Sequence, residues 1–303
     1  MQCRWYSSKV RIIPFSGTTR IKTCNIGYKS PVKWREVYYY ELCDPYIAGI
    51  LKLNGNGERQ NKVAPYRFAI SGGNHAGWGY WCHSLYSMVP PFLYDTHPEY
   101  FSEINGKRIA PVGKEGGTQL CLTNPDVLKL SVEKLRKEMS KPVTGMPVWA
   151  DSTATYWSIS QMDGNGNCTC DECKRLDKYD GSPSGSILSY VNKVAAKFPH
   201  KKIATLAYIY SRKAPRYTKP APNVAIQLCA IETARDGINL PITSSPIHAS
   251  FRNDFQEWGR ICNDIVVWDY VVQFQNLISP FPNFSVMQDN IQFYIKNNAT
   301  GIF

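Results

Sequence analysis

Four apolar stretches in the second half of the chain decide the fold. Residues 154–162 have the sequence ATYWSISQM, residues 203–210 IATLAYIY, residues 224–231 VAIQLCAI and residues 265–270 IVVWDY. Such nearly continuous apolar runs are typical of the buried strands of a parallel sheet that is covered on its outer face. The segments between and after them carry apolar residues at helical spacing, over residues 125–139, 182–198, 251–261 and 286–295. This alternation predicts an α/β protein with a parallel sheet covered by helices.

The sequence favours a closed barrel over a doubly wound sheet. We find no GxGxxG after the first strand and no GxxxxGK[ST], so nucleotide-binding folds are disfavoured. We therefore predict a (β/α)8 TIM-type barrel over residues 31–303, preceded by a short N-terminal β appendage over residues 1–30. The final residues Gly301-Ile302-Phe303 have the character of one more strand. Because a closed barrel needs every strand paired, we expect the barrel to be truncated at its C-terminal end.

Composition excludes several classes of protein. With 303 residues, 43% hydrophobic and 19% charged, the chain can bury a large core and is neither disordered nor a coiled coil. The net charge is +11, but residues 1–35 hold eight basic side chains and no acid, so the excess is local and we expect no nucleic-acid partner. We also expect no membrane span, since no run of 18 uncharged apolar residues occurs. The start lacks the apolar stretch of a signal peptide, and the oligomeric state is not predicted.

Three carboxylates directly follow apolar strands. Asp163 ends the first run, Glu232 follows the third, and Asp269 lies at the end of the fourth. The carboxyl ends of barrel strands are where catalytic groups lie. A single acid there could equally cap a helix or pair with a lysine, but three at corresponding strand ends point to acid and base chemistry of the glycosidase type.

Aromatic side chains and two histidines accompany these carboxylates. Their rings offer apolar faces on which sugars can stack, although core packing is the alternative role. His97 lies in a dense polar and aromatic stretch, and a histidine in such a setting can contact substrate. The candidate substrate-binding residues from this group are Tyr208, Tyr210, Trp268, Tyr270, His83 and His97.

Three cysteines form a tight cluster just after Asp163. Cys168, Cys170 and Cys173 could supply three corners of a tetrahedral zinc site, although the usual signature has two separated pairs. Their spacing does not identify a fourth ligand. A structural metal, a disulfide and free thiols all remain open, and a metal here would brace the loop beside Asp163 rather than catalyse.

Ordered blocks along the chain carry a resemblance to a known family. They are Thr96-His97-Pro98-Glu99-Tyr100-Phe101, Asn105-Gly106-Lys107-Arg108, Gln119-Leu120-Cys121-Leu122-Thr123-Asn124-Pro125, Ser160-Gln161-Met162-Asp163 with the three cysteines, Gly181-Ser182-Pro183-Ser184-Gly185, Trp268-Asp269-Tyr270 and Pro280-Phe281-Pro282-Asn283. Together they resemble the domain-of-unknown-function 4838 family over roughly residues 30–303. That family overlaps glycoside hydrolase family 163, the endo-β-N-acetylglucosaminidases of gut Bacteroidetes that act on complex N-glycans.

The resemblance implies a barrel glycosidase, often periplasmic, cell-surface or secreted, that acts on N-acetylglucosamine-containing glycans. We expect Glu232 to be the general acid, Asp163 the second carboxylate, which polarises an acetamido group or acts directly, and Asp269 its alternate. Gln161 is added to the substrate-binding residues. No cofactor is required for this chemistry, and a structural zinc is the one metal expected.

Two departures from the family keep alternatives open. Met162 stands where the family commonly has asparagine, and the chain stops where family members continue. The alternatives are a carbohydrate-binding barrel without catalysis, a glycosidase of different specificity such as an α-glucuronidase, and a metal- or redox-responsive protein.

Overall fold

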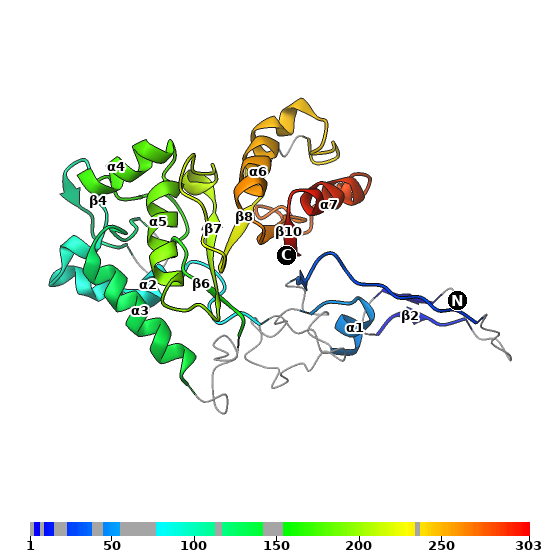
Figure 1. The fold of residues 1–303 in the computed structure, drawn as a ribbon. Helices are drawn as coiled ribbons and strands as arrows, with labels where there is room; N and C mark the ends of the chain where they lie inside the picture. The colour runs from blue at the N-terminus through cyan, green and yellow to red at the C-terminus, as the bar shows by residue number, and fades with distance from the viewer. Residues whose placement is uncertain are drawn as a thin grey trace.

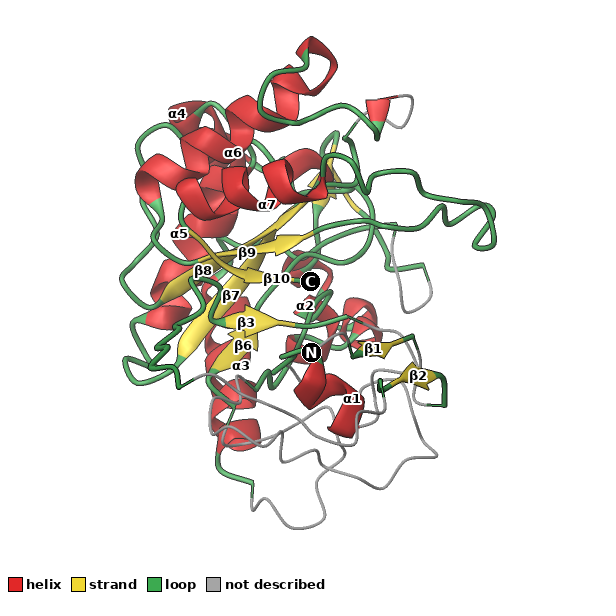
Figure 2. Ribbon diagram, turned by 90° about the vertical axis from the view of Figure 1, so that its right-hand side faces the viewer, coloured by secondary structure: helices red, strands yellow, loops and turns green. Residues whose placement is uncertain are grey.

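The computed structural model describes residues 3–6, 9–14, 23–37, 45–54, 77–112, 117–141, 154–233 and 237–303. Within them, six parallel strands form one sheet in the order β3-β10-β9-β8-β7-β6. Figure 2 shows this sheet with helices packed against it. The strands are β3 (Trp34–Arg35), β6 (Tyr156–Ser158), β7 (Lys202–Ala207), β8 (Val224–Cys229), β9 (Ile265–Trp268) and β10 (Ala299–Ile302).

The three strands β7, β8 and β9 form the middle of the sheet because their sequences are almost wholly apolar. The pairing of β7 with β8 extends from Ile203 opposite Val224 to Ala207 opposite Leu228. Every residue of β8 is buried, including the polar Gln227. This burial confirms the buried strands that the apolar runs predict.

Helices follow the strands as the periodicity predicts. Asn124 begins α3 by accepting hydrogen bonds from the backbone N–H groups of Asp126 and Val127, as an N-cap does. Residues of α5 and α6 join outward-facing strand residues such as Ile203 and Val267 in the larger core. The helices are α1 (Pro45–Ile50), α2 (Leu85–Met88), α3 (Pro125–Met139), α4 (Asp171–Asp180), α5 (Ser184–Ala195), α6 (Ala249–Ile261) and α7 (Met287–Lys296).

The remaining regular elements are short. Two antiparallel hairpins pair β1 (Arg4–Trp5) with β2 (Arg11–Ile12) and β4 (Glu103–Ile104) with β5 (Lys107–Arg108). The first hairpin lies apart from the sheet (Figure 1). The 3-10 helices are η2 (Pro91–Asp95), η3 (Pro98–Tyr100), η4 (Ile209–Ser211) and η6 (Pro246–His248).

A second core of aromatic and small residues fills the inner face of the sheet. It comprises Trp34, Trp78, Trp81, Tyr156, Ala204, Ala225 and Val266. Trp34 lies on the edge strand β3, and its ring centroid is 5.4 Å from that of Trp78, which forms a parallel bridge to β6 at the opposite edge. The sheet is therefore curled, with its two edges brought together by tryptophan side chains.

The prediction of a (β/α)8 barrel is wrong. In the described part of the chain the sheet has six parallel strands, and β3 and β6 are not hydrogen-bonded to each other. Strand and helix alternate in closed barrels and in open curled sheets alike, so the pattern could not separate the two. Residues 31–120, rich in glycine and proline, supply only β3 and the Trp78 bridge to this sheet in the described residues. The strand at the end of the chain is confirmed as β10, whereas the division at residue 30 stays a prediction.

No helix in the described ranges is long and apolar enough to cross a membrane.

Candidate functional site

A pocket of about 260 Å³ opens on the inner face of the sheet at the carboxyl ends of β7, β8 and β9. It is lined by His83, Asp163, Leu206, Tyr208, Cys229, Ile231, Trp268, Tyr270 and Phe274. Aromatic side chains therefore make up much of a wall that holds a single carboxylate. Sequence reasoning missed Phe274, which follows β9 in an irregular segment without a periodic signal.

Asp163 is fixed in this pocket by Tyr208. The Tyr208 hydroxyl donates a hydrogen bond of 3.0 Å to Asp163 Oδ1. Burial raises the pKa of Tyr208 well above its ordinary value, and the neighbouring Asp163 carboxylate raises this pKa further. The hydroxyl consequently keeps its proton and remains a donor to Asp163.

Gln161 is a supporting residue and does not line the pocket. Its Nε2 donates to the backbone oxygen of Tyr208 at 3.2 Å, and its Oε1 accepts from Ser211 Oγ at 2.5 Å. Both ends of the buried amide are thus used inside the protein, where they hold the turn after β7.

Gln119 is a second support, and sequence reasoning missed it. Its Oε1 accepts from the backbone N–H of Met162 at 2.8 Å, and its Nε2 donates to the backbone oxygens of Met162 and Asn165 at 3.2 and 3.1 Å. These bonds fasten the backbone on both sides of Asp163. The only sequence signal was its place at the start of the block over residues 119–125.

Glu232 lies beside the pocket without lining it. Its Oε2 is 3.0 Å from Nη1 of Arg212, and its side chain is 35% exposed. Arg212 also binds Asp254 of α6 at 2.7 Å and donates to Ser250. Sequence reasoning did not identify Arg212 as the partner of this carboxylate, because the two residues meet only through the fold.

Asp269 directly follows the end of β9 and does not line this pocket. Trp268 and Tyr270, its neighbours on either side, both line the pocket, and their rings stack at 6.4 Å. Asp269 instead lines a cavity of about 30 Å³ near α7. There its carboxylate adds to the effect of burial, which raises the pKa of Tyr294 well above its ordinary value.

The other predicted substrate contacts separate into two groups. His83 lines the pocket, with Nδ1 2.8 Å from the backbone oxygen of Gln161 and a left-handed backbone φ of 46°. His97 does not line it, because its ring stacks on Tyr100 at 4.5 Å and its Nδ1 lies 3.0 Å from Glu99. Tyr210 is also outside the pocket; burial first, and the Asp177 carboxylate second, raise its pKa.

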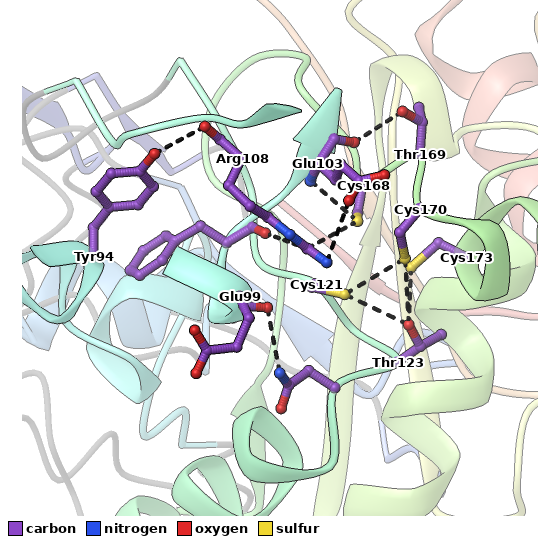
Figure 3. Close-up of polar contacts among 12 residues, drawn as sticks. Tyr94, Glu99, Glu103, Arg108, Cys121, Thr123, Cys168, Thr169, Cys170 and Cys173 are labelled. Carbon is purple, nitrogen blue, oxygen red and sulfur yellow. Dashed lines mark hydrogen bonds and ion pairs between the residues drawn. The ribbon is translucent and has the colours of Figure 1, made fainter. Parts of the chain in front are cut away.

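The fold places a fourth cysteine, Cys121, next to the three clustered cysteines, and sequence reasoning missed it. The sulfur atoms of Cys121, Cys168, Cys170 and Cys173 all lie within 4.8 Å of one another (Figure 3). All four are free cysteines without a disulfide. Cys121 is 49 residues from Cys170 and belongs to no CxxC pair, so local spacing gave no sign of it.

Polar groups surround these four sulfurs. The backbone N–H of Glu103 donates to Cys168 Sγ at 3.3 Å, and Arg108 Nη1 lies 3.9 Å from the same sulfur. The Thr123 hydroxyl is 3.3 Å from Cys173 Sγ. Figure 3 shows these groups converging from the β4–β5 hairpin and the segment after it.

The fold and these sites define an α/β protein with a curled parallel sheet, a pocket at its strand ends and a four-cysteine cluster beside it. The chain belongs to the family described as "Domain of unknown function (DUF4838)", whose model matches residues 5–303. The predicted membership of this family is confirmed; the likeness to glycoside hydrolase family 163 stays a prediction.

Comparisons with curated proteins and with solved structures add little to the family assignment. No curated protein matches the chain. Among solved structures, it is similar to the GH36 α-galactosidase AgaA from Geobacillus stearothermophilus in complex with raffinose, with 10% identity and a TM-score of 0.27. The match covers 74% of this chain and 30% of that one, so this chain spans less than a third of that enzyme's length. A likeness at this TM-score carries no argument about function.

Proposed function

We propose that this chain is a glycoside hydrolase whose catalytic carboxylates lie at the strand-end pocket. The observation that carries the proposal is Asp163, which faces an aromatic-lined pocket and accepts a hydrogen bond from Tyr208. Sugar rings can stack on flat apolar rings. A fixed carboxylate stabilises the positive charge that develops when a glycosidic bond breaks.

Asp163 is the carboxylate that acts on the sugar itself. Tyr208 holds Oδ1, and no other described residue bonds Oδ2, which can accept a hydrogen bond from an acetamido group or stabilise an oxocarbenium-like transition state. Gln119 and Gln161 hold the backbone around it, so the carboxylate is oriented before substrate binds.

Glu232 is the general acid: after it leaves Arg212 and takes up a proton from solvent, it donates this proton to the leaving glycosidic oxygen. Its ion pair with Arg212 is at the rim, and its side chain is accessible to solvent. When Glu232 turns toward a bound glycan, Arg212 retains Asp254 and Ser250, so no buried charge is left unpaired. Asp269 is not assigned a role because it lines the other cavity.

For the substrate we propose N-acetylglucosamine-containing glycans, cleaved within the chain of sugars, and for the location the periplasm, the cell surface or the exterior. The support for both is the resemblance of the ordered sequence blocks to glycoside hydrolase family 163.

The test is incubation of the purified chain with a biantennary complex N-glycoprotein, followed by mass spectrometry of released glycans. We expect release by the native chain, a loss of about 10²- to 10⁴-fold in Asp163→Asn and in Glu232→Gln, and none in Glu257→Gln. Glu257 is an exposed carboxylate of α6 and serves as the matched control. Full activity in both Asp163→Asn and Glu232→Gln would contradict the proposal.

A second candidate is a glycan-binding domain without catalysis. The ion pair between Glu232 and Arg212 favours this second candidate, as does Met162, which directly precedes Asp163. Calorimetry with a glycan panel separates the two candidates, because binding without any released product supports the second.

A further inference from the structure

We propose that Cys121, Cys168, Cys170 and Cys173 bind one zinc ion as a closed structural site. The sequence cluster supplies three of these ligands, and the fold supplies the fourth from a distant segment. This proposal does not depend on the proposed glycosidase activity.

The distances between the sulfur atoms fit a tetrahedral metal. A Zn–S bond of ~2.3 Å places neighbouring sulfurs of a tetrahedron about 3.8 Å apart. Cys121 Sγ and Cys170 Sγ are 3.7 Å apart, and all four sulfurs lie within 4.8 Å of one another. None of the four sulfurs is bonded to another, since all four cysteines are free.

The burial of the cluster also fits a structural metal. Cys121, Cys168 and Cys173 are 3%, 5% and 1% exposed, and Cys170 is half-buried. Four protein ligands leave no open position for water or substrate, which is the arrangement of structural rather than catalytic zinc. On binding, Zn²⁺ displaces the thiol protons into solvent, and no electron is transferred.

A cation and a hydrogen-bond donor lie beside the sulfurs, as expected around a metal site with net negative charge. Four thiolates around Zn²⁺ carry two negative charges in excess, and the Arg108 guanidinium lies beside Cys168 to offset one of them. The Glu103 N–H donates to the same sulfur, as outer groups commonly do around metal thiolates. Arg108 is itself held by the backbone oxygen of Phe101 at 2.8 Å and by Glu103 at 3.6 Å.

The ion would join the loop that carries Asp163 to the segment that holds the backbone of this loop. Cys121 is two residues from Gln119, which holds the backbone of Met162 and Asn165. Cys168 follows the same loop three residues after Asn165, and Cys170 and Cys173 lie at the start of α4. A metal bound to both Cys121 and Cys168 would therefore link the two segments and hold the loop that carries Asp163 in place.

The first test is elemental analysis of the full chain after expression with added zinc. We expect one zinc per chain, no iron, and a loss of zinc of at least about tenfold in Cys121→Ser. The matched control is Cys262→Ser, a buried cysteine outside the cluster, which should retain one zinc. Less than about a fifth of a zinc per native chain, iron in its place, or full zinc in Cys121→Ser would overturn the proposal.

A second test needs no variant and so does not depend on the folding of Cys121→Ser. The native chain is stripped of metal under reducing conditions and titrated with Co²⁺. We expect the charge-transfer and ligand-field absorption of tetrahedral cobalt thiolate at one equivalent. Octahedral cobalt spectra, or two disulfides found by mass spectrometry of the chain purified anaerobically, would contradict a four-thiolate site.

Discussion

The four-cysteine cluster and the strand-end pocket share one loop, which carries both Asp163 and Cys168, and they differ in how completely the fold assembles them. In the cluster, four identical donors converge from two segments that are far apart in the sequence. In the pocket, one of the three predicted carboxylates faces the cavity, while Glu232 pairs with Arg212 and Asp269 faces elsewhere. Metal binding to such a set of ligands is coupled to folding, whereas a substrate pocket can be completed by the substrate and by side-chain movement.

The largest expected effect is the loss of the cluster's metal. Removing zinc with a chelator and a reductant should lower the melting temperature by about 10 °C or more, since a structural metal contributes folding free energy directly. Scanning fluorimetry with and without added Zn²⁺ measures it. An unchanged melting temperature in a chain shown to have lost its zinc would mean that the cluster does not stabilise the fold.

The next largest effect concerns the pocket carboxylate. Asp163→Asn should lower glycan release by about 10²- to 10⁴-fold and leave the metal content at one zinc per chain, because the carboxylate bonds Tyr208 and the four ligands of the cluster are other residues. A loss of zinc in this variant would show that the two regions are not separable. Activity is measured by mass spectrometry and zinc by elemental analysis.

Gln119→Leu tests the connection between the two regions. It removes three hydrogen bonds to the Asp163 loop and leaves the backbone groups of Met162 and Asn165 without these partners. We expect a loss of about 1–3 kcal/mol in the free energy of unfolding, and a lower kcat, with zinc retained. Gln288→Leu, at an exposed position on α7, is the control and should change neither quantity.

Tyr208→Phe should have the smallest effect. It removes the donor to Asp163 but keeps the aromatic wall, so we expect glycan release to fall by about tenfold with little change in substrate affinity. A rise in KM with unchanged kcat would instead place Tyr208 among the groups that only bind the sugar. Steady-state kinetics over a range of glycan concentrations separates the two results.

The differences between prediction and structure have physical causes. The strands β7, β8 and β9 were predictable because each is a long apolar run. The count of strands was not, because closure depends on the pairing of β3 and β6, at opposite edges of the sheet. The direction of Asp269 was not predictable because this residue lies just beyond β9, where the regular alternation of the strand ends.

Other parts of the site required the three-dimensional structure. Cys121 joins the cluster only because the segment after β5 returns alongside the loop that follows β6. Arg212 forms its ion pair with Glu232 only because η4 and the end of β8 lie next to each other. Such pairings depend on how elements pack, and local sequence patterns do not determine them.

The measurement that tests the account most directly is zinc K-edge X-ray absorption spectroscopy of the purified chain. We predict a first coordination shell of four sulfur atoms at about 2.3 Å, with no nitrogen or oxygen ligand. A shell that contains nitrogen or oxygen would contradict the assignment of all four cysteines as ligands. It would also contradict the proposal that the metal links the Cys121 segment to the loop that carries Asp163.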